Sequence, residues 1–255
     1  MTRWVSNLPF QTDAGLGARA RIGMVVLAND YTIEHEFAEV ASGLRGVALY
    51  ASRIPMSPVV TPDSLAAMQA DITASSELIL AGDRVDVVAY GCSSATAVLG
   101  EDVVFDLVRR GKPGAQVTTP ITAAKAAMSA FGARRIAVLT PYTRDVNESI
   151  LSAFTAAGLD VPVFGSFDEP HDAVVASITE DSMINSACDL VSGEAIDAIF
   201  ISCTSLRGLH VAPRLEAELG IPVTASNHAM LWHALRLARV SDAIDGFGQL
   251  YKLPA

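Results

Sequence analysis

The sequence contains no long apolar run. None of its apolar stretches approaches the roughly 18 residues from which a membrane-spanning helix is inferred, so we expect no contact with a membrane. Residues 1–13 lack the basic-then-apolar order of a secretory signal, and we interpret them as a loosely held arm that packs on a neighbouring lobe or subunit. These features predict a cytoplasmic protein that forms a homo-oligomer.

Basic residues and cysteines are also scarce. The chain has 18 Lys and Arg against 28 Asp and Glu, a formal net charge of −10, which argues against nucleic acid as a partner because phosphates require a basic surface. Its three cysteines fit no disulfide framework and are expected as free thiols. No Cys-x-x-Cys pair occurs, and the five histidines show no ligand spacing with the cysteines, so no metal site is predicted.

The sequence signatures of common cofactor and hydrolase sites are missing as well. No G-x-G-x-x-G loop is present to hold a dinucleotide, and no G-x-S-x-G turn is present to hold a catalytic serine. We therefore expect neither a dinucleotide-binding loop nor a serine hydrolase of this type.

What the sequence does contain is an alternation of short apolar strands and helical stretches. Hydrophobic residues make up 51% of the chain and aromatic residues only 6%, which is typical of helices packed closely on parallel strands. A helix-like spacing covers residues 64–81, and a closing helix is predicted over residues 233–240. The predicted strands cover residues 22–27, 47–50, 85–90, 116–118, 136–139, 161–164, 198–202 and 223–225.

Strands separated by helices predict an α/β fold with parallel sheets. The two halves repeat in order and spacing, so we expect two similar doubly wound lobes related by a pseudo-two-fold axis. The predicted division is an N-terminal lobe with its arm over residues 1–120 and a C-terminal lobe over residues 121–225. A C-terminal helix and tail over residues 226–255 would then pack back on the first lobe.

Two of the predicted strand ends carry reactive groups. Val-Val-Ala-Tyr-Gly-Cys-Ser-Ser at residues 87–94 and Ala-Ile-Phe-Ile-Ser-Cys-Thr-Ser at residues 198–205 each end in a cysteine followed by two hydroxyl residues. Ligands bind at the carboxyl edge of parallel sheets, so Cys92 and Cys203 are expected to face one cleft. Helices starting beside them would aim N–H groups at the sulfurs and lower the thiol pKa. Cys188 is interpreted as a packing residue, the usual role of a lone cysteine.

This pair of strand ends resembles the aspartate/glutamate racemase superfamily, and more specifically its branch with maleate cis-trans isomerase and arylmalonate decarboxylase. Residues 22–34, 201–207 and 225–237 look most similar to the ectoine utilization protein A group within that branch. The resemblance runs from about residue 21 to residue 240. It implies a cofactor-free enzyme with its active site between two lobes.

The resemblance also implies roles for individual residues. Cys92 would be the nucleophile and Cys203 the proton donor in a racemase or isomerase of a small carboxylate, with a place in ectoine degradation. The residues that would hold the substrate carboxylate are Ser93, Ser94, Tyr142, Thr204 and Ser205. Two alternatives stay open: decarboxylation through Cys203 alone, as in the arylmalonate decarboxylases, and a binding protein without turnover.

One position departs from the maleate isomerases, which resemble this chain but carry Pro-Ser-Ser-Asn-Thr-Thr after the first strand. Here the run is Leu-Ala-Asn-Asp-Tyr-Thr, which places Asp30, or Asn29 if the register slips, at the substrate-binding asparagine. An ionised Asp30 would repel a second substrate carboxylate and favours a substrate with an amino or amide group. Its alternative role is to cap the helix that follows.

Overall fold

The structure, a computed structural model, describes residues 2–254 and contains two parallel four-stranded sheets, which confirms the predicted α/β fold class. The strand orders β2-β1-β3-β4 and β6-β5-β7-β8 are the same arrangement repeated in the two halves of the chain. The strands are β1 (Ala20–Leu27), β2 (Val47–Ile54), β3 (Val87–Tyr90), β4 (Gln116–Thr118), β5 (Arg135–Thr140), β6 (Asp160–Ser166), β7 (Ala198–Ile201) and β8 (Val223–Ala225).

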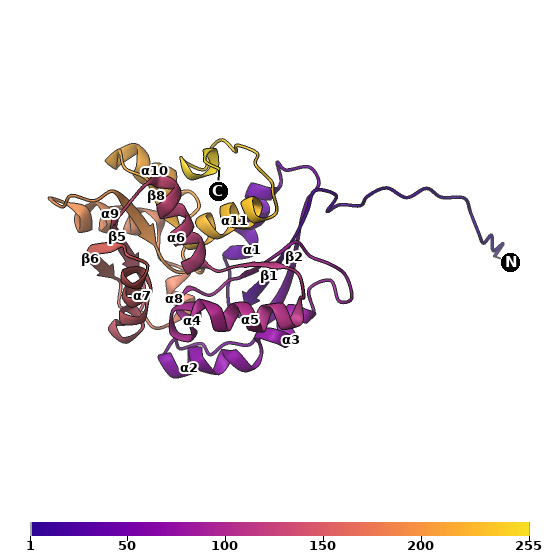
Figure 1. The fold of residues 1–255 in the computed structure, drawn as a ribbon, viewed down its shortest axis with the longest axis horizontal. Helices are drawn as coiled ribbons and strands as arrows, with labels where there is room; N and C mark the ends of the chain where they lie inside the picture. The colour runs from indigo at the N-terminus through magenta and orange to yellow at the C-terminus, as the bar shows by residue number, and fades with distance from the viewer. Residues whose placement is uncertain (1, 255) are drawn as a thin grey trace.

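Helices surround both sheets (Figure 1). Several begin where the sequence offers a capping hydroxyl: Thr61, Thr119 and Thr179 each accept a hydrogen bond from the backbone N–H three residues on. The helices are α1 (Ile33–Ala41), α2 (Pro62–Ala67), α3 (Ile72–Glu77), α4 (Ser93–Leu99), α5 (Glu101–Gly111), α6 (Pro120–Phe131), α7 (Arg144–Ala156), α8 (Asp172–Val175), α9 (Glu180–Val191), α10 (Val211–Leu219) and α11 (Ser226–Leu237).

Two helix predictions need correction. The apolar spacing over residues 64–81 does not form one helix, because a 3₁₀ turn at Met68–Ala70 separates α2 from α3. The closing helix begins at Ser226 rather than at residue 233, directly after β8. Ser226 thereby lies at the carboxyl edge of the second sheet.

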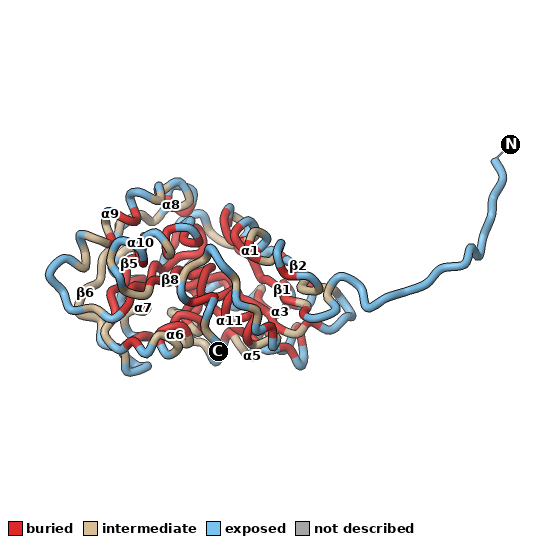
Figure 2. Tube along the Cα trace, turned by 90° about the horizontal axis from the view of Figure 1, so that it is seen from above, coloured by how far each residue is buried: buried red, intermediate tan, exposed pale blue. Residues whose placement is uncertain are grey.

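The core is built on both faces of the first sheet. Ile22 and Met24 of β1 point to a cluster that includes Trp232 of α11. Val25 and Leu27, on the opposite face, belong to a second cluster that continues into the other sheet. The buried segments accordingly form a continuous band through the body of the protein (Figure 2). This packing fixes the carboxyl ends of both sheets relative to each other.

The N-terminal arm extends away from the body (Figures 1 and 2). Its large apolar side chains are open to solvent, and Trp4 and Phe10 are 88% and 86% exposed. The arm packs on neither lobe of its own chain (Figure 1), contrary to one of the two predicted possibilities, and its packing on a neighbouring subunit stays a prediction. Among residues 2–254, no helix has the length and apolar character to cross a membrane.

Candidate active site

The two cysteines singled out by the sequence occupy equivalent places. Cys92 is the second residue after β3, and Cys203 is the second residue after β7, the corresponding strand of the other sheet. A single hydroxyl joins the two strand ends. Ser226 Oγ lies 2.9 Å from Ser93 Oγ and accepts a hydrogen bond of 2.9 Å from the Cys203 backbone N–H. The structure therefore brings both motifs into one site.

Cys92 is the N-cap residue of α4. Its sulfur accepts a hydrogen bond from the Ala95 N–H at 3.4 Å and lies 3.6 Å from Ser94 Oγ. Glycine is favoured in the turn before it, because a Cβ on Gly91 would lie 2.8 Å from the end of the Ile33 side chain and 3.1 Å from the Val25 carbonyl oxygen. The predicted helix N–H donors are present, but burial outweighs them and raises the thiol pKa to about 11.

Cys203 has different surroundings. The next helix, α10, begins only at Val211, so the prediction of a helix N-terminus beside this cysteine is wrong. Its φ of 142° is one that residues with a side chain rarely adopt. The Tyr142 hydroxyl and the Ser205 N–H donate to the sulfur, yet burial and the nearby Asp172 carboxyl hold the thiol pKa far above its usual value. Both cysteines are therefore neutral thiols in the closed site, contrary to the predicted lowering of their pKa.

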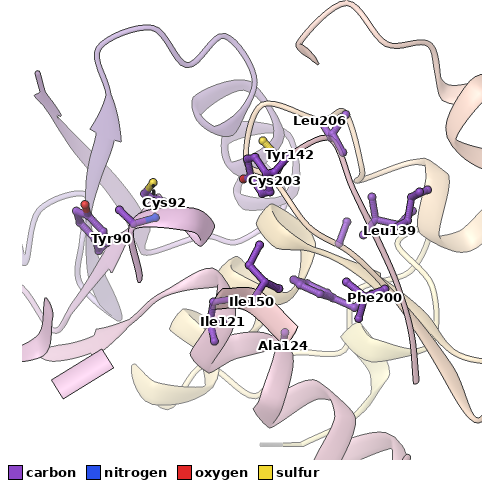
Figure 3. Packing of buried hydrophobic residues seen from close by; sticks show 14 of the residues in the cluster. Tyr90, Cys92, Ile121, Ala124, Leu139, Tyr142, Ile150, Phe200, Cys203 and Leu206 are labelled. Atoms are coloured by element: carbon purple, nitrogen blue, oxygen red, sulfur yellow. Dashed lines mark hydrogen bonds between the residues drawn. The ribbon is translucent and has the colours of Figure 1, made fainter. Parts of the chain in front are cut away.

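Tyr142 is placed by the loop after β5. Its carbonyl accepts a hydrogen bond of 2.7 Å from Asn147 Nδ2 and another from the Ser166 hydroxyl. Figure 3 shows its side chain beside Cys203, with Cys92 at the neighbouring strand end. Burial, and after it both sulfurs, raise the pKa of the phenol, so the hydroxyl stays protonated and can donate a hydrogen bond.

The four predicted Ser and Thr residues of the site are all buried, but their hydroxyls have different hydrogen-bond partners. They are Ser93, Ser94, Thr204 and Ser205. The Ser93 hydroxyl bonds to the serine that also holds Cys203. The Thr204 hydroxyl donates to a backbone carbonyl of the other strand end at 3.3 Å, and the Ser205 hydroxyl donates to Asp172 Oδ1 at 2.8 Å. Ser94 is the one whose hydroxyl lies against a candidate catalytic sulfur.

Asp30 caps the helix that follows it, whereas its role in substrate selection stays a prediction. Its Oδ1 accepts hydrogen bonds from the N–H groups of Thr32 and Ile33 at 2.7 and 2.9 Å and so caps the start of α1. Its Oδ2 is buried and has no hydrogen-bond partner among residues 2–254. Burial raises the pKa of Asp30 to about 6, although the two N–H donors and the nearby Thr204 hydroxyl lower it, and the Asp172 carboxyl raises it further.

Asp172 is a site residue that the sequence reasoning missed. It is the first residue of α8 and is 4% exposed, with Oδ1 bonded to Ser205 and Oδ2 unpartnered among the described residues. Burial raises its pKa. The charge of its carboxylate also raises the pKa of both the Cys92 and the Cys203 thiol. Five residues of loop separate it from the end of β6, and no strand-end motif marks it in the sequence.

Unpartnered polar atoms gather at this edge of the sheets. Buried polar groups in proteins almost always have a hydrogen-bond partner, so a cluster of exceptions marks a place where a ligand can supply one. Six buried side-chain atoms lack a partner among residues 2–254, and every one follows or ends a strand of the two sheets. They are Asn29 Oδ1, Asp30 Oδ2, Tyr90 Oη, Asp172 Oδ2, Ser202 Oγ and Asn227 Oδ1.

A hydrogen-bond chain supports the Cys203 turn from behind. Asn227 Nδ2 donates to the Thr204 carbonyl and to Glu36 Oε2, both at 2.8 Å. Glu36 Oε1 accepts from the Leu209 N–H at 2.9 Å, and burial raises the pKa of this carboxyl to about 8. The turn that carries Cys203 is thus tied to α1 of the first lobe.

Two loops also meet beside the site. Val59 forms an isolated antiparallel bridge with His171, and the Val60 N–H donates to the Pro170 carbonyl at 3.2 Å. This contact joins the segments after β2 and β6 directly next to Asp172. Cys92 and Cys203 are themselves only 2% and 4% exposed.

Comparison with known proteins finds similarity to arylmalonate decarboxylases and maleate isomerases. The profile of the arylmalonate decarboxylase family matches residues 62–251. A maleate isomerase of Nocardia farcinica is 28% identical over 242 residues, 91% of this chain and 95% of the relative. An arylmalonate decarboxylase of Bordetella bronchiseptica is 36% identical over 154 residues, 59% of this chain and 63% of the relative.

A solved structure shares the fold over nearly the whole chain. It is a cysteine-to-serine variant of Nocardia farcinica maleate cis-trans isomerase with a covalently bound succinylcysteine intermediate. It superimposes with a TM-score of 0.82 at 27% identity and covers 91% of this chain and 98% of its own. The closer likeness to the ectoine utilization group stays a prediction.

Proposed function

The chain belongs to the arylmalonate decarboxylase family, and we propose that it is a cofactor-independent isomerase or racemase of a small carboxylate. The observation that carries this proposal is the meeting of Cys92 and Cys203 at equivalent strand ends of one buried site. The succinylcysteine in the Nocardia farcinica relative supports a reacting cysteine in such a site.

Two reactions fit two thiols that face one carbon. In racemisation, a thiolate takes the proton from the α-carbon, and the opposite thiol gives its own proton to the other face. In cis-trans isomerisation, the Cys92 thiolate forms a bond to one alkene carbon and the Cys203 thiol gives its proton to the other. The single bond then rotates, the Cys203 thiolate takes a proton back from that carbon, and breaking of the C–S bond restores the alkene and the Cys92 thiolate.

The neighbouring donors have a role in both reactions. Negative charge develops on the substrate carboxylate, and preorganised N–H and O–H groups stabilise it. Ser94 beside Cys92 and Tyr142 beside Cys203 are the donors we assign to this task, together with the backbone and side chains of Ser93, Thr204 and Ser205. Placement in ectoine breakdown is part of the proposal and is supported by the resemblance of residues 22–34 and 225–237.

Decarboxylation is the second candidate, favoured by the family profile and by the 36% identical relative. It would need Cys203 alone to protonate the carbanion that loss of carbon dioxide leaves. The presence of a well-placed Cys92 favours the two-thiol reactions instead.

The test is incubation of the purified protein with small unsaturated, amino and malonate acids in deuterated water. Proton NMR then follows α-hydrogen exchange and alkene geometry, and evolved carbon dioxide is measured in parallel. Exchange or geometric conversion without carbon dioxide supports the proposal. Carbon dioxide release that persists in Cys92→Ser supports the decarboxylase, and binding without any turnover supports a binding protein.

A further inference from the structure

We infer that the substrate carries a protonated amino group, which binds between Asp30 Oδ2 and Asp172 Oδ2 next to the two thiols. This inference rests on the proposed function and names its substrate class: an acid with one carboxylate and one ammonium group. The named relatives are enzymes of maleate and arylmalonate, which are dicarboxylates. The two aspartates distinguish the site from one built for such dianions.

The two carboxyl groups have the same incomplete pattern of hydrogen bonds. In each, Oδ1 accepts from neutral protein donors, the backbone N–H groups of Thr32 and Ile33 for Asp30 and the Ser205 hydroxyl for Asp172. In each, Oδ2 has no partner among residues 2–254. The two residues are 3% and 4% exposed, so water does not satisfy these oxygens from the open surface.

Both acids lie near the reacting groups. Thr32, whose N–H donates to Asp30 Oδ1, also donates its hydroxyl to the Ser205 carbonyl at 2.8 Å. The Ser205 hydroxyl in turn donates to Asp172 Oδ1, and Ser205 follows Cys203 by two residues. Thr32 and Ser205 therefore connect the aspartates, and a ligand atom that reaches both orphaned oxygens would lie at the Cys203 turn. Because the aspartates come from different lobes, such an atom would also link the lobes.

Among residues 2–254, no cationic side chain forms a hydrogen bond or ion pair with either aspartate. The oxygens of both aspartates are either bonded to neutral donors or unpartnered within the described chain. Arg53, which reaches the backbone carbonyl of Asp30, also contacts two further carbonyls and pairs with Glu34. A second substrate carboxylate here would add a like charge in a low-dielectric site.

An ammonium group fits the same place in charge and in donors. Its N–H groups can bond to both orphaned oxygens, and its positive charge balances the carboxylates. It also acts on the chemistry, because a cation beside the sulfurs favours the thiolate and opposes the effect of burial. The substrate itself would thus help to activate the thiol that removes its proton.

The experiment compares substrates on wild type, Asp172→Asn and Asp30→Asn. The probes are maleate, phenylmalonate and a panel of L-amino acids with three to five carbons, studied by calorimetry and by α-hydrogen exchange in deuterated water. We expect amino acids to bind and exchange in wild type, and each Asn variant to lower their kcat/KM by about a hundredfold while improving maleate binding. Asp168→Asn, an exposed carboxyl in the same segment as Asp172, is the matched control and should change neither.

The outcomes separate this inference from the proposed function. Turnover of maleate or phenylmalonate but of no amino acid would keep a family-type reaction and overturn the ammonium site. Absence of amino-acid binding at millimolar concentration would also overturn it. Amino-acid binding that Asp172→Asn weakens, without exchange or conversion, would support the ammonium site and overturn the two-thiol reaction.

Discussion

The two cysteine-bearing strand ends share a topology and differ in almost everything local. Cys92 caps a helix, has an extended φ of −143° and receives an N–H from Ala95. Cys203 sits in a non-helical turn at φ 142° and receives the Tyr142 hydroxyl. The backbone of its turn is held by two side chains: Ser226 accepts from the Cys203 N–H, and Asn227 donates to the Thr204 carbonyl. A repeat in the fold therefore does not mean a repeat in the chemistry.

This difference assigns roles to the two thiols. Burial raises both pKa values, but the helix N–H and the Ser94 hydroxyl keep that of Cys92 at about 11, lower than that of Cys203. The sulfur that ionises more readily is the better nucleophile or base, and the other is the better source of a proton. The asymmetry thus supports Cys92 as the attacking group and Cys203 as the acid.

The largest expected effect comes from removing either thiol. Cys92→Ser and Cys203→Ser should each lower racemisation or isomerisation by at least about a thousandfold, since a serine hydroxyl is a far poorer base and nucleophile at neutral pH. Cys188→Ser, on α9 and only partly buried, is the matched control and should leave the rate nearly unchanged. Initial rates by NMR measure the effect. Near-normal turnover in Cys203→Ser would show that the two strand ends do not act together.

The pH profile should sharpen the comparison. A thiol with a raised pKa of about 11 is almost fully protonated at neutral pH. For the reaction in which Cys92 is the attacking base or nucleophile, kcat/KM should therefore rise about tenfold per pH unit between about pH 7 and 9, because the fraction of Cys92 thiolate grows. Cys203, whose pKa is higher, stays protonated over this range. An alkaline fall of kcat/KM before pH 9 would mean that the acid titrates first, which would reverse the roles.

The sequence predicted the parts of the site that depend on strands and chain order. All eight predicted strand ranges overlap strands of the structure, and short apolar runs before Cys92 and Cys203 were enough to place both at the sheet edge. The difference between the two strand ends was not predictable in this way. It depends on where a helix starts after each cysteine and on partners such as Tyr142 that come from distant segments.

Asp172 shows a second limit. Its place in the site results from the loop after β6, which meets the segment after β2 through Val59 and His171. No local pattern in the sequence encodes that meeting. The thiol pKa values were mispredicted for a related reason, because burial is a property of the whole packed structure and outweighs the local N–H donors.

Removing the hydrogen bonds of Asn227 behind the Cys203 turn should have an intermediate effect on the rate. Asn227→Ala removes the amide that holds the Thr204 carbonyl and Glu36 together. The Cys203 turn should then lose its fixed orientation, and kcat should fall about tenfold with little change in KM, since positioning acts mainly on the chemical step. Asn185→Ala, on the exposed side of α9, is the control. A rise in KM at constant kcat would instead place Asn227 in substrate binding.

The smallest effect tests the backbone difference itself. At Cys203, φ 142° is strained for any residue with a Cβ, whereas at Cys92 the extended φ suits ordinary residues. Cys203→Gly should therefore be more stable than Cys203→Ala by about 1 kcal/mol. Cys92 is the N-cap of α4, where serine is preferred to glycine, so Cys92→Ser should be more stable than Cys92→Gly. Cys203 caps no helix and has a strained φ, so Cys203→Ser should be less stable than Cys203→Gly. Because each comparison removes the thiol from both members, the loss of sulfur packing cancels. Chemical denaturation of the five variants measures the free energy of unfolding. The same order of Ser and Gly at both positions would contradict a strained turn as the feature that sets the second strand end apart.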